Sequence, residues 1–171
     1  MRESKMQYNL SLTIKETAKR NGVNVALIRL TESKSIYMKH WIFISSPKQF
    51  RMHDWLASNE YVEYLQRNKV EVNDIIYLYT TAPVQRIEYK MIVDKINVPF
   101  DEIIDDSAYQ LHRNPRTVPN KDALYVRLKL IKKVDNPLLH LNFLRGYGLR
   151  SSMQSALTVS GDLLEYIETK F

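Results

Sequence analysis

Two stretches of the sequence combine aromatic rings with hydroxyl groups. The first contains Trp41 and ends in Ser45 and Ser46, and the second ends in Tyr79 and Thr80. Aromatic faces stack on flat rings, and hydroxyl groups both donate and accept hydrogen bonds. If the chain brings the two stretches together, these side chains can form a pocket for a flat polar ligand such as a nucleobase.

Residues that could support catalysis are few. A helical metal pair has histidines at positions i and i+4, and none of the four histidines has this spacing: His40, His53, His112 and His140. The sequence contains no phosphate-binding glycine loop, nucleophile elbow or zinc-protease motif. The acids of segment 101–106 could bind a divalent cation, although an exposed acidic turn is the more common explanation. We therefore expect a protein that is not an enzyme, with no metal site and no cofactor.

Two strands must position the aromatic and hydroxyl side chains. The side chains of residues 40–46 would alternate between the two faces of a strand, and residues 75–81 form a β-prone apolar run. The pair Asn73 and Asp74 is a turn signal directly before the second strand. Residues 87–98 predict a third strand, which we expect to pair with the second as a hairpin.

The remaining elements place helices at the margins of a sheet. Residues 123–134 alternate apolar and basic side chains with period two, which is typical of a half-buried strand. We expect helical or irregular structure at 54–56 and 60–67, a short helix or loop at 138–147, and a terminal helix at 163–170. With about six strands and no strand–helix alternation, the sequence predicts the α+β class, as a mixed β-barrel with flanking helices.

Residues 1–39 predict an extension that precedes this barrel. Ser11 could cap a helix that runs to about Asn21, and residues 23–30 are typical of a strand. We expect the extension to pack on the barrel. The chain then divides into residues 1–39 and 40–171.

The composition indicates one main compact domain. The chain has 171 residues, of which 44% are hydrophobic, and it has no cysteine, which excludes disulfides and thiolate zinc sites. No apolar run approaches the ~20 residues of a membrane span, and the N-terminus lacks the apolar core of a signal peptide. We therefore expect a cytoplasmic protein without a membrane partner.

Positive charge is concentrated in one part of the chain. The net charge is +6, and segment 110–150 alone carries nine basic and two acidic residues. Such a segment suits a nucleic acid, because each phosphate contact releases counterions, although a solvated basic face has the same composition. The residues that we expect to bind phosphate are Arg113, Arg116, Lys132, Lys133, Arg145 and Arg150.

Three motifs match one known family. Residues 40–47 are similar to a strand of the type Y-W-x-F-x-x-x-P, and residues 62–79 to the type I-D-W-x-Q-S-x-x-x-x-V-G-D-I-V-Y-I-Y. Residues 148–154 are similar to the type G-L-x-x-x-x-Q-G. On these motifs, residues 40–169 resemble the EVE domain, a PUA-like β-barrel related to the YTH readers of methylated adenine. The resemblance implies a PUA-like fold and an aromatic cage around a flipped, modified base.

The resemblance also assigns individual pocket residues. It places Tyr64 where the family usually has a cage tryptophan, and Gln66 where the family has a polar residue. Asn73 and Ser155 stand where the family has glycines, and asparagine can adopt the left-handed conformation that glycine provides. Together with the aromatic and hydroxyl residues, the resemblance predicts a base-binding pocket formed by Trp41, Ser45, Ser46, Tyr64, Gln66, Tyr79, Thr80 and Gln154.

We expect a module that captures one modified base, methylated above all, in DNA rather than in RNA. The resemblance implies a specificity or sensor subunit of a modification-dependent restriction or defence system, which would need a separate nuclease subunit. Phosphate contacts would set the register, and the pocket would supply the selectivity. Three alternatives remain open: an RNA-binding module of the PUA and ASCH type, a small metal-dependent nuclease or hydrolase that uses the acids of 101–106, and an interaction protein whose N-terminal helix recruits partners.

Overall fold

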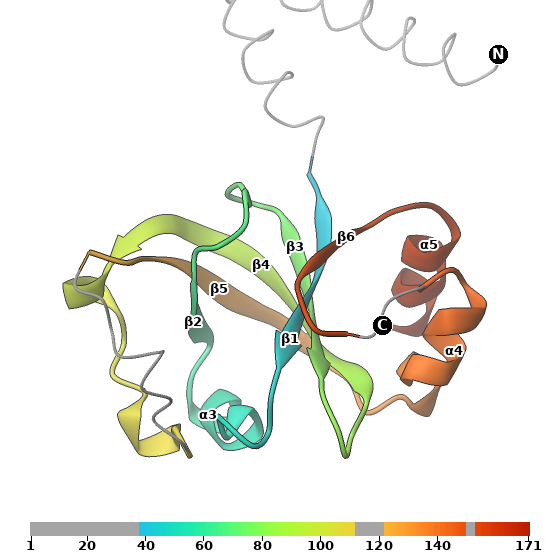
Figure 1. Ribbon diagram of the computed structural model, residues 1–171, viewed down its shortest axis with the longest axis horizontal. Helices are drawn as coiled ribbons and strands as arrows, with labels where there is room; N and C mark the ends of the chain where they lie inside the picture. The colour runs from blue at the N-terminus through green and yellow to red at the C-terminus, as the bar shows by residue number, and fades with distance from the viewer. Residues whose placement is uncertain (1–37, 112–121, 150–152) are drawn as a thin grey trace, which may run out of the picture. The chain divides into compact units, whose positions relative to one another are not determined.

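The structure is a computed structural model that describes residues 38–111, 122–149 and 153–171. Within these residues, the strands form one sheet in the order β2-β5-β4-β3-β1-β6 (Figure 1). The strands are β1 (His40–Ser45), β2 (Tyr61–Leu65), β3 (Ile75–Thr80), β4 (Arg86–Pro99), β5 (Leu124–Lys133) and β6 (Leu157–Val159). The predicted N-terminal helix and strand, within residues 1–37, lie outside the described residues.

Helices and short turns flank the sheet. No helix in the described part of the chain is long and apolar enough to cross a membrane. The α-helices are α3 (Met52–Ser58), α4 (Leu141–Gly146) and α5 (Gly161–Lys170), and short 3₁₀ turns occur at Phe100–Glu102, Ser107–Tyr109 and Pro137–Leu139.

The pairing of β1 brings the two hydroxyl-ended strands together. β1 pairs in parallel with β3 and antiparallel with β6. Parallel neighbours need a long crossover, and here the chain forms both α3 and β2 between β1 and β3. The β1–β3 register places Ser45 beside Thr80. The hydroxyl ends of the two predicted strands therefore lie side by side.

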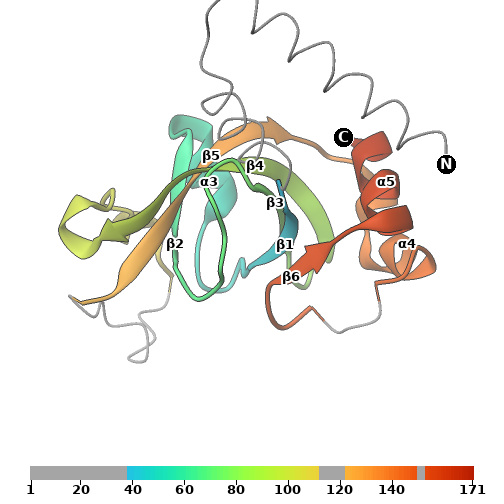
Figure 2. The ribbon, with the colours of Figure 1, turned by 90° about the horizontal axis from the view of Figure 1, so that it is seen from above.

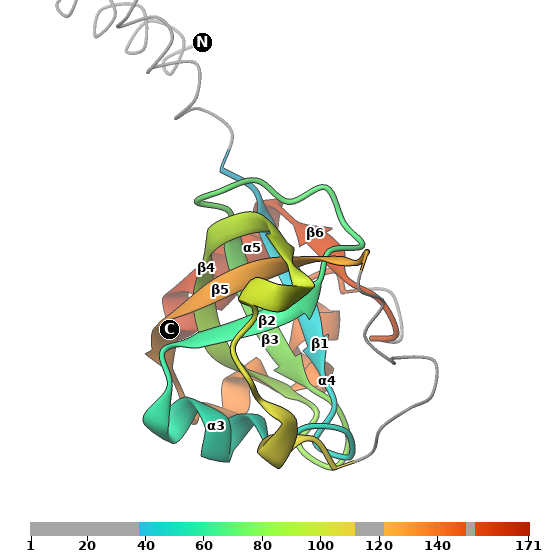
Figure 3. The same cartoon turned by 90° about the vertical axis from the view of Figure 1, so that its left-hand side faces the viewer.

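The sheet curls into a half-barrel (Figures 2 and 3). β2, at one edge of the sheet, comes back towards β1, and the ring centroids of Phe43 and Tyr64 are 5.7 Å apart. The helices lie at the margins of this curled sheet (Figure 1). The α+β class with a mixed, barrel-like sheet and flanking helices is therefore confirmed.

Each face of the sheet has its own apolar core. On the inner face, Phe43 and Leu78 pack with Trp55 of α3. On the outer face, α4 and α5 bury Leu144 and Ile167 against the sheet. β3 has a strand on each side and a core on each face, so every one of its residues is buried.

Most of the predicted elements are present, with one error. The expected hairpin is confirmed by the antiparallel pairing of β3 with β4, and the strand at 123–134 and the terminal helix are confirmed by β5 and α5. Helical or irregular structure at 60–67 was wrong, because residues 61–65 form β2 and pair along β5. In this short edge strand only Val62 is fully buried, so the alternation of the sequence gives little signal.

Candidate functional site

Three aromatic rings form a row on the inner face of the half-barrel. Trp41 and Phe43 lie two residues apart on β1, and their ring centroids are 6.4 Å apart. Phe43 also meets Tyr64 of β2 edge to face. Phe43 is 4% exposed, whereas Trp41 and Tyr64 are only partly buried. This aromatic row, made of Trp41, Phe43 and Tyr64, therefore has a closed centre and two more accessible ends.

The hydroxyl group of Ser45 continues this inner face and has unused hydrogen-bonding capacity. Ser45 is 3% exposed, and its Oγ makes no hydrogen bond of ordinary geometry to any described residue. The Tyr64 hydroxyl is its neighbour: burial raises the pKa of Tyr64, and the Ser45 hydroxyl offsets this rise in part. An unsatisfied buried hydroxyl costs ~1–3 kcal/mol and calls for an explanation, of which a ligand is one.

Thr80, unlike Ser45, makes a side-chain hydrogen bond of ordinary geometry. Its Oγ1 donates to Glu88 Oε2 at 2.7 Å, and Arg86 bonds the other Glu88 oxygen at 3.2 Å. Arg86 Nη2 also lies 2.7 Å from a carboxylate oxygen of Asp135. An ionised carboxylate only accepts hydrogen bonds, so the hydroxyl hydrogen of Thr80 is committed to Glu88. Towards any other group, the Thr80 oxygen is an acceptor.

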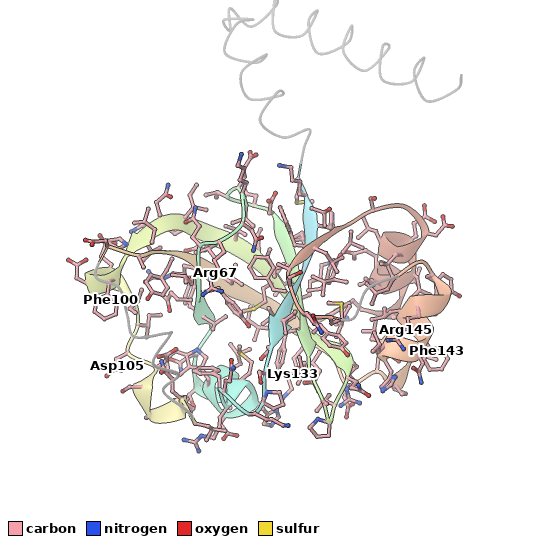
Figure 4. The ribbon with its side chains drawn as sticks, in the orientation of Figure 1. Arg67, Phe100, Asp105, Lys133, Phe143 and Arg145 are labelled. Carbon is pink, nitrogen blue, oxygen red and sulfur yellow. The ribbon has the colours of Figure 1, made fainter. Side chains whose placement is uncertain are left out.

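Charged groups lie beyond this polar end of the inner face, around Tyr89. Burial raises the pKa of Tyr89 to about 12, with further contributions from Glu88 and Asp54. Lys133 Nζ lies 5.9 Å from the centre of the Tyr89 ring and 2.5 Å from Nδ1 of His53, on α3 (Lys133 is labelled in Figure 4). The inner face thus combines aromatic rings, hydroxyl groups and a basic side chain.

The indole of Trp41 is fixed by a structural contact. Its Nε1 donates to Asp74 Oδ2 at 2.9 Å. Asp74, which is 1% exposed, also accepts from the backbone N–H groups of Lys39 and Glu71. Since the indole N–H is occupied, Trp41 could serve a ligand through its ring face and not through its nitrogen.

Other residues of the predicted pocket lie elsewhere. Tyr79 is adjacent to Thr80 but belongs to the outer core. The side chain of Gln66 bonds Asn97, donating to its side-chain oxygen and accepting from its backbone N–H. Gln154 is exposed, and Ser46 is partly buried at the end of β1. The structure thus brings Trp41, Ser45, Tyr64 and Thr80 to one face of the sheet, and it does not place Tyr79 there.

The predicted phosphate-binding residues do not form one patch among the described residues. Lys132 bonds the carbonyl oxygen of Phe171 at the C-terminus, whereas Lys133 contacts Tyr89 and His53. These two neighbours on β5 therefore point to opposite faces of the sheet. Arg145 is exposed on α4 (Figure 4). The remaining three predicted residues, Arg113, Arg116 and Arg150, lie outside the described residues.

The acidic segment 101–106 makes local contacts. Glu102 pairs with Lys95 at 2.6 Å, Asp105 accepts from the Ser107 N–H, and Asp106 accepts from Gln110. In the part of the chain that the structure describes, no group of three or more His, Cys, Asp or Glu side chains could hold a metal ion.

Some inner-face residues were missed by the sequence analysis. Phe43 has the same parity as Trp41 and Ser45 along the first strand, so the period of two could have placed it on the same face. The pairing of Thr80 with Glu88 has no such signal. It depends on a β-bulge that shifts the β3–β4 register between Leu78 and Tyr79.

Comparisons with known proteins identify the fold. No protein-family model and no curated protein sequence matches this chain. The crystal structure of ASCH from Zymomonas mobilis is similar, with a TM-score of 0.56 and 11% identity over 78% of this chain and 96% of that chain. A hypothetical protein from Leishmania major has a TM-score of 0.53 and 18% identity over 78% of this chain and 94% of that chain. A Pseudomonas syringae protein has a TM-score of 0.55 and 16% identity over 76% of this chain and 97% of that chain.

These similarities establish a PUA-like fold. ASCH domains, like EVE domains, belong to the PUA-like superfamily, so the fold implied by the sequence resemblance is confirmed. The EVE family in particular is not confirmed, since the similar structures include ASCH proteins. At 11–18% identity, the similarity extends to the fold alone.

Proposed function

We propose that this chain is a nucleic-acid-binding module that takes one unstacked base against the inner face of the half-barrel. The aromatic row supplies π-faces, and the hydroxyl groups of Ser45, Tyr64 and Thr80 read the polar edge of the base. The observation that carries the proposal is the Ser45 hydroxyl, which is buried beside the Tyr64 hydroxyl and makes no hydrogen bond of ordinary geometry to a described residue. A ligand that supplies the missing bond would remove the cost of ~1–3 kcal/mol.

The energies involved are compatible with base capture. Stacking of a base on an aromatic side chain contributes ~1–3 kcal/mol. Extrusion of a base from a duplex costs a few kcal/mol, and less where the base is already unpaired. Stacking and the new hydrogen bonds together offset this cost. The edge contacts then decide which base, or which modification, is retained.

We place a modified base in DNA first among the targets. This choice rests on the sequence resemblance to EVE domains, which also suggests a specificity or sensor role beside a separate nuclease subunit. Binding, without catalysis and without a cofactor, is the role proposed for the chain itself. The expected phosphate contacts would come from the basic segment 110–150, which has nine basic and two acidic residues.

The RNA-binding module of PUA and ASCH type is the second candidate. The observation that favours it is the structural similarity to ASCH from Zymomonas mobilis, whose chain is covered to 96%. The same inner face would then capture an unpaired base of an RNA loop or end, where bases are already unstacked.

A panel of short oligonucleotides tests both candidates. The panel consists of matched DNA and RNA strands that differ only in one base and its modification, and affinity is measured by fluorescence anisotropy with the full chain. We expect one modified strand to bind at least about tenfold more tightly than its unmodified counterpart, which is ~1.4 kcal/mol. Equal binding across all members of both sets would contradict base capture.

A further inference from the structure

A groove of about 610 Å³ lies at the edge of the sheet where β6 is the last of the described strands. Its volume is in the range of small-molecule sites, which span about 300–1,000 Å³. Two chain segments and the start of α5 line it: residues 147–149, residues 157–160, and Asp162 and Leu163. The aromatic row and the hydroxyl groups of the proposed base site do not line this groove.

Tyr147 presents a fixed aromatic face to the groove. Its ring stacks on Tyr166 of α5, with centroids 3.8 Å apart and an angle of 16° between the planes. Tyr166 is itself held, because its hydroxyl donates to the Leu138 carbonyl at 2.8 Å. Tyr147 nevertheless remains 46% exposed. One side of the ring is therefore packed, and the other is available to a ligand.

Tyr147 lies between two glycines, Gly146 and Gly148. Apart from the adjacent residues of the chain and the backbone of α4, no atom lies within 4 Å of a Cβ atom built on Gly146 or Gly148. Gly148 has a φ of +104°, in the left-handed region that favours glycine. The chain thus turns sharply after Tyr147 without placing a side chain beside the ring.

The lining of the groove suits a flat ring with N–H groups better than a phosphate. Its floor is apolar, since Leu149, Val159 and Leu163 are each less than a tenth exposed. Asp162 is the charged side chain among the described lining residues, and its carboxylate would repel an anion. The same carboxylate accepts hydrogen bonds from ring or amino N–H groups.

We propose that this groove is a second base-stacking site, which takes a nucleotide next to the captured base. The neighbouring base stacks on Tyr147, and its N–H edge faces Asp162. This inference rests on the proposed function. The groove and the aromatic row lie on neighbouring strands at the β6 edge of the sheet, because β6 pairs with β1 and places Thr158, which lines the groove, opposite Trp41 of the aromatic row. A strand with two consecutive unstacked bases would therefore occupy both sites.

The test uses the full chain and the preferred oligonucleotide from the panel. In further strands, an abasic residue replaces either the captured base or each of its two neighbours in turn. We expect Tyr147→Ala to weaken binding of the intact strand by about 5- to 150-fold, the effect of losing one base–aromatic stack. One of the two strands has its abasic residue at the neighbour that stacks on Tyr147. For that strand, we expect Tyr147→Ala and the wild-type chain to have the same affinity. Tyr147→Trp should retain or improve the affinity.

Phe143→Ala is the matched control. Phe143 is 47% exposed, lies on α4 close to Tyr147 in sequence, and does not line the groove (Figure 4). We expect this variant to bind all strands like the wild-type chain. Thermal unfolding of both variants shows whether loss of the Tyr147–Tyr166 stack changes the fold.

The outcomes separate the second site from the proposed function. Equal losses on intact and abasic-neighbour strands, or no loss in well-folded Tyr147→Ala, would overturn the stacking site and leave base capture standing. A second outcome is that an abasic residue at the captured position leaves the affinity unchanged, while Tyr147→Ala weakens binding only of strands with both neighbours intact. In that case base capture fails and the stacking site stands. A wild-type chain that binds none of the strands overturns both.

Discussion

Ser45 and Thr80 are neighbours on adjacent strands, yet their hydroxyl groups are in different states. Thr80 donates to Glu88, whereas Ser45 makes no hydrogen bond of ordinary geometry and has the Tyr64 hydroxyl as its neighbour. Substitutions that remove one hydroxyl group at a time should therefore have different effects. Loss of the Thr80 hydroxyl should lower stability, and loss of the Ser45 hydroxyl should lower affinity for a ligand. Thr80→Val should lower the free energy of unfolding by about 1 kcal/mol, because Glu88 loses a donor. An unchanged urea midpoint in Thr80→Val would show that the Thr80–Glu88 bond contributes nothing measurable.

Tyr64 combines a packing role with the proposed reading role. Its ring meets Phe43 at 5.7 Å, so Tyr64→Ala would disturb the core and binding together. Tyr64→Phe keeps the ring and removes only the hydroxyl group. We expect about a fivefold loss of affinity for the preferred base, which corresponds to one neutral hydrogen bond of ~1 kcal/mol, with little change in thermal stability. An unaltered affinity in this variant would remove the hydroxyl group from the proposed site.

Asp74 lies directly before β3 and bonds groups near the first residues of β1 and β3. It is 1% exposed and accepts from Trp41 Nε1 and from the backbone N–H groups of Lys39 and Glu71. Asp74→Ala leaves these donors without an acceptor, and we expect a loss of roughly 2–4 kcal/mol in the free energy of unfolding. Asp94→Ala, at an exposed position on β4, is the control. A loss no larger than that of the control would contradict the role of Asp74.

At the scale of elements, polar contacts hold α5 on the outer face of the sheet. Lys90 Nζ bonds both carboxylate oxygens of Glu168, at 2.7 and 2.6 Å. The Tyr77 hydroxyl donates to Glu168, and His40 Nδ1 lies 3.0 Å from the same hydroxyl. Asn136 adds a bond to the Lys170 carbonyl at the end of the helix. α5 is thus attached to three strands of the sheet by one group of side chains.

These contacts predict how stability changes with pH. Burial lowers the pKa of His40 below its ordinary 6.5, partly opposed by Glu168. The His40 contribution is therefore present above pH 6.5 and is lost as the pH falls through the lower, folded-state pKa. Burial also opposes ionisation of Glu168, but hydrogen bonds from Lys90 and Tyr77 outweigh it and lower the pKa below 4.5. The Glu168 contribution is present above pH 4.5 and is lost on further acidification.

Glu168→Gln tests this attachment. We expect a loss on the order of 1 kcal/mol in the free energy of unfolding at neutral pH, since the pair is partly exposed, and a smaller loss below pH 4. Urea unfolding across this pH range measures both. Glu165→Gln, an exposed position on the same helix, is the control. Equal effects of the two substitutions at all pH values would contradict the assignment.

The sequence predicts elements best where the pattern is strong and the neighbours are local. The sequence pattern predicted β3 from its apolar run, its hairpin to β4, and β5 from its alternation. Asn73 has a φ of 77°, the left-handed conformation expected of this turn. The parallel pairing of β1 with β3 was not predicted, because no local residue pattern encodes which distant strand becomes a neighbour. β6 was also missed, since three residues are too few to show a period.

At the scale of the whole molecule, the sequence supplied candidate residues for the site but not their geometry, and their binding role stays a prediction. Trp41, Ser45, Tyr64 and Thr80 do share one face of the sheet. Tyr79 was assigned to the same pocket, although adjacent residues of a strand point to opposite faces. The state of each hydroxyl depends on tertiary contacts, such as the Thr80–Glu88 bond, that composition and spacing do not contain.

The distribution of positive charge predicts a salt-dependent interaction. If about five phosphates are contacted, the slope of log K against log salt should be near −4.5 for duplex DNA and near −3.5 for single strands. Lys133 shares the inner face with Tyr89, whereas Lys132 bonds Phe171 on the other side of β5. We therefore expect Lys133→Ala to reduce the slope by about one, and Lys132→Ala to leave it unchanged. Equal slopes for both variants would contradict a phosphate contact confined to the inner side.

The most direct test of base capture compares Ser45→Ala with the wild-type chain in two measurements on the same samples. These are the affinity for the preferred oligonucleotide and for its unmodified counterpart, and the free energy of unfolding without nucleic acid. Removal of a buried hydroxyl that makes no hydrogen bond of ordinary geometry should leave stability equal or slightly higher. Affinity for the preferred strand should fall about 5- to 10-fold and approach that of the unmodified strand. Lower stability with both affinities unchanged would make Ser45 a packing residue and would contradict base capture at this face.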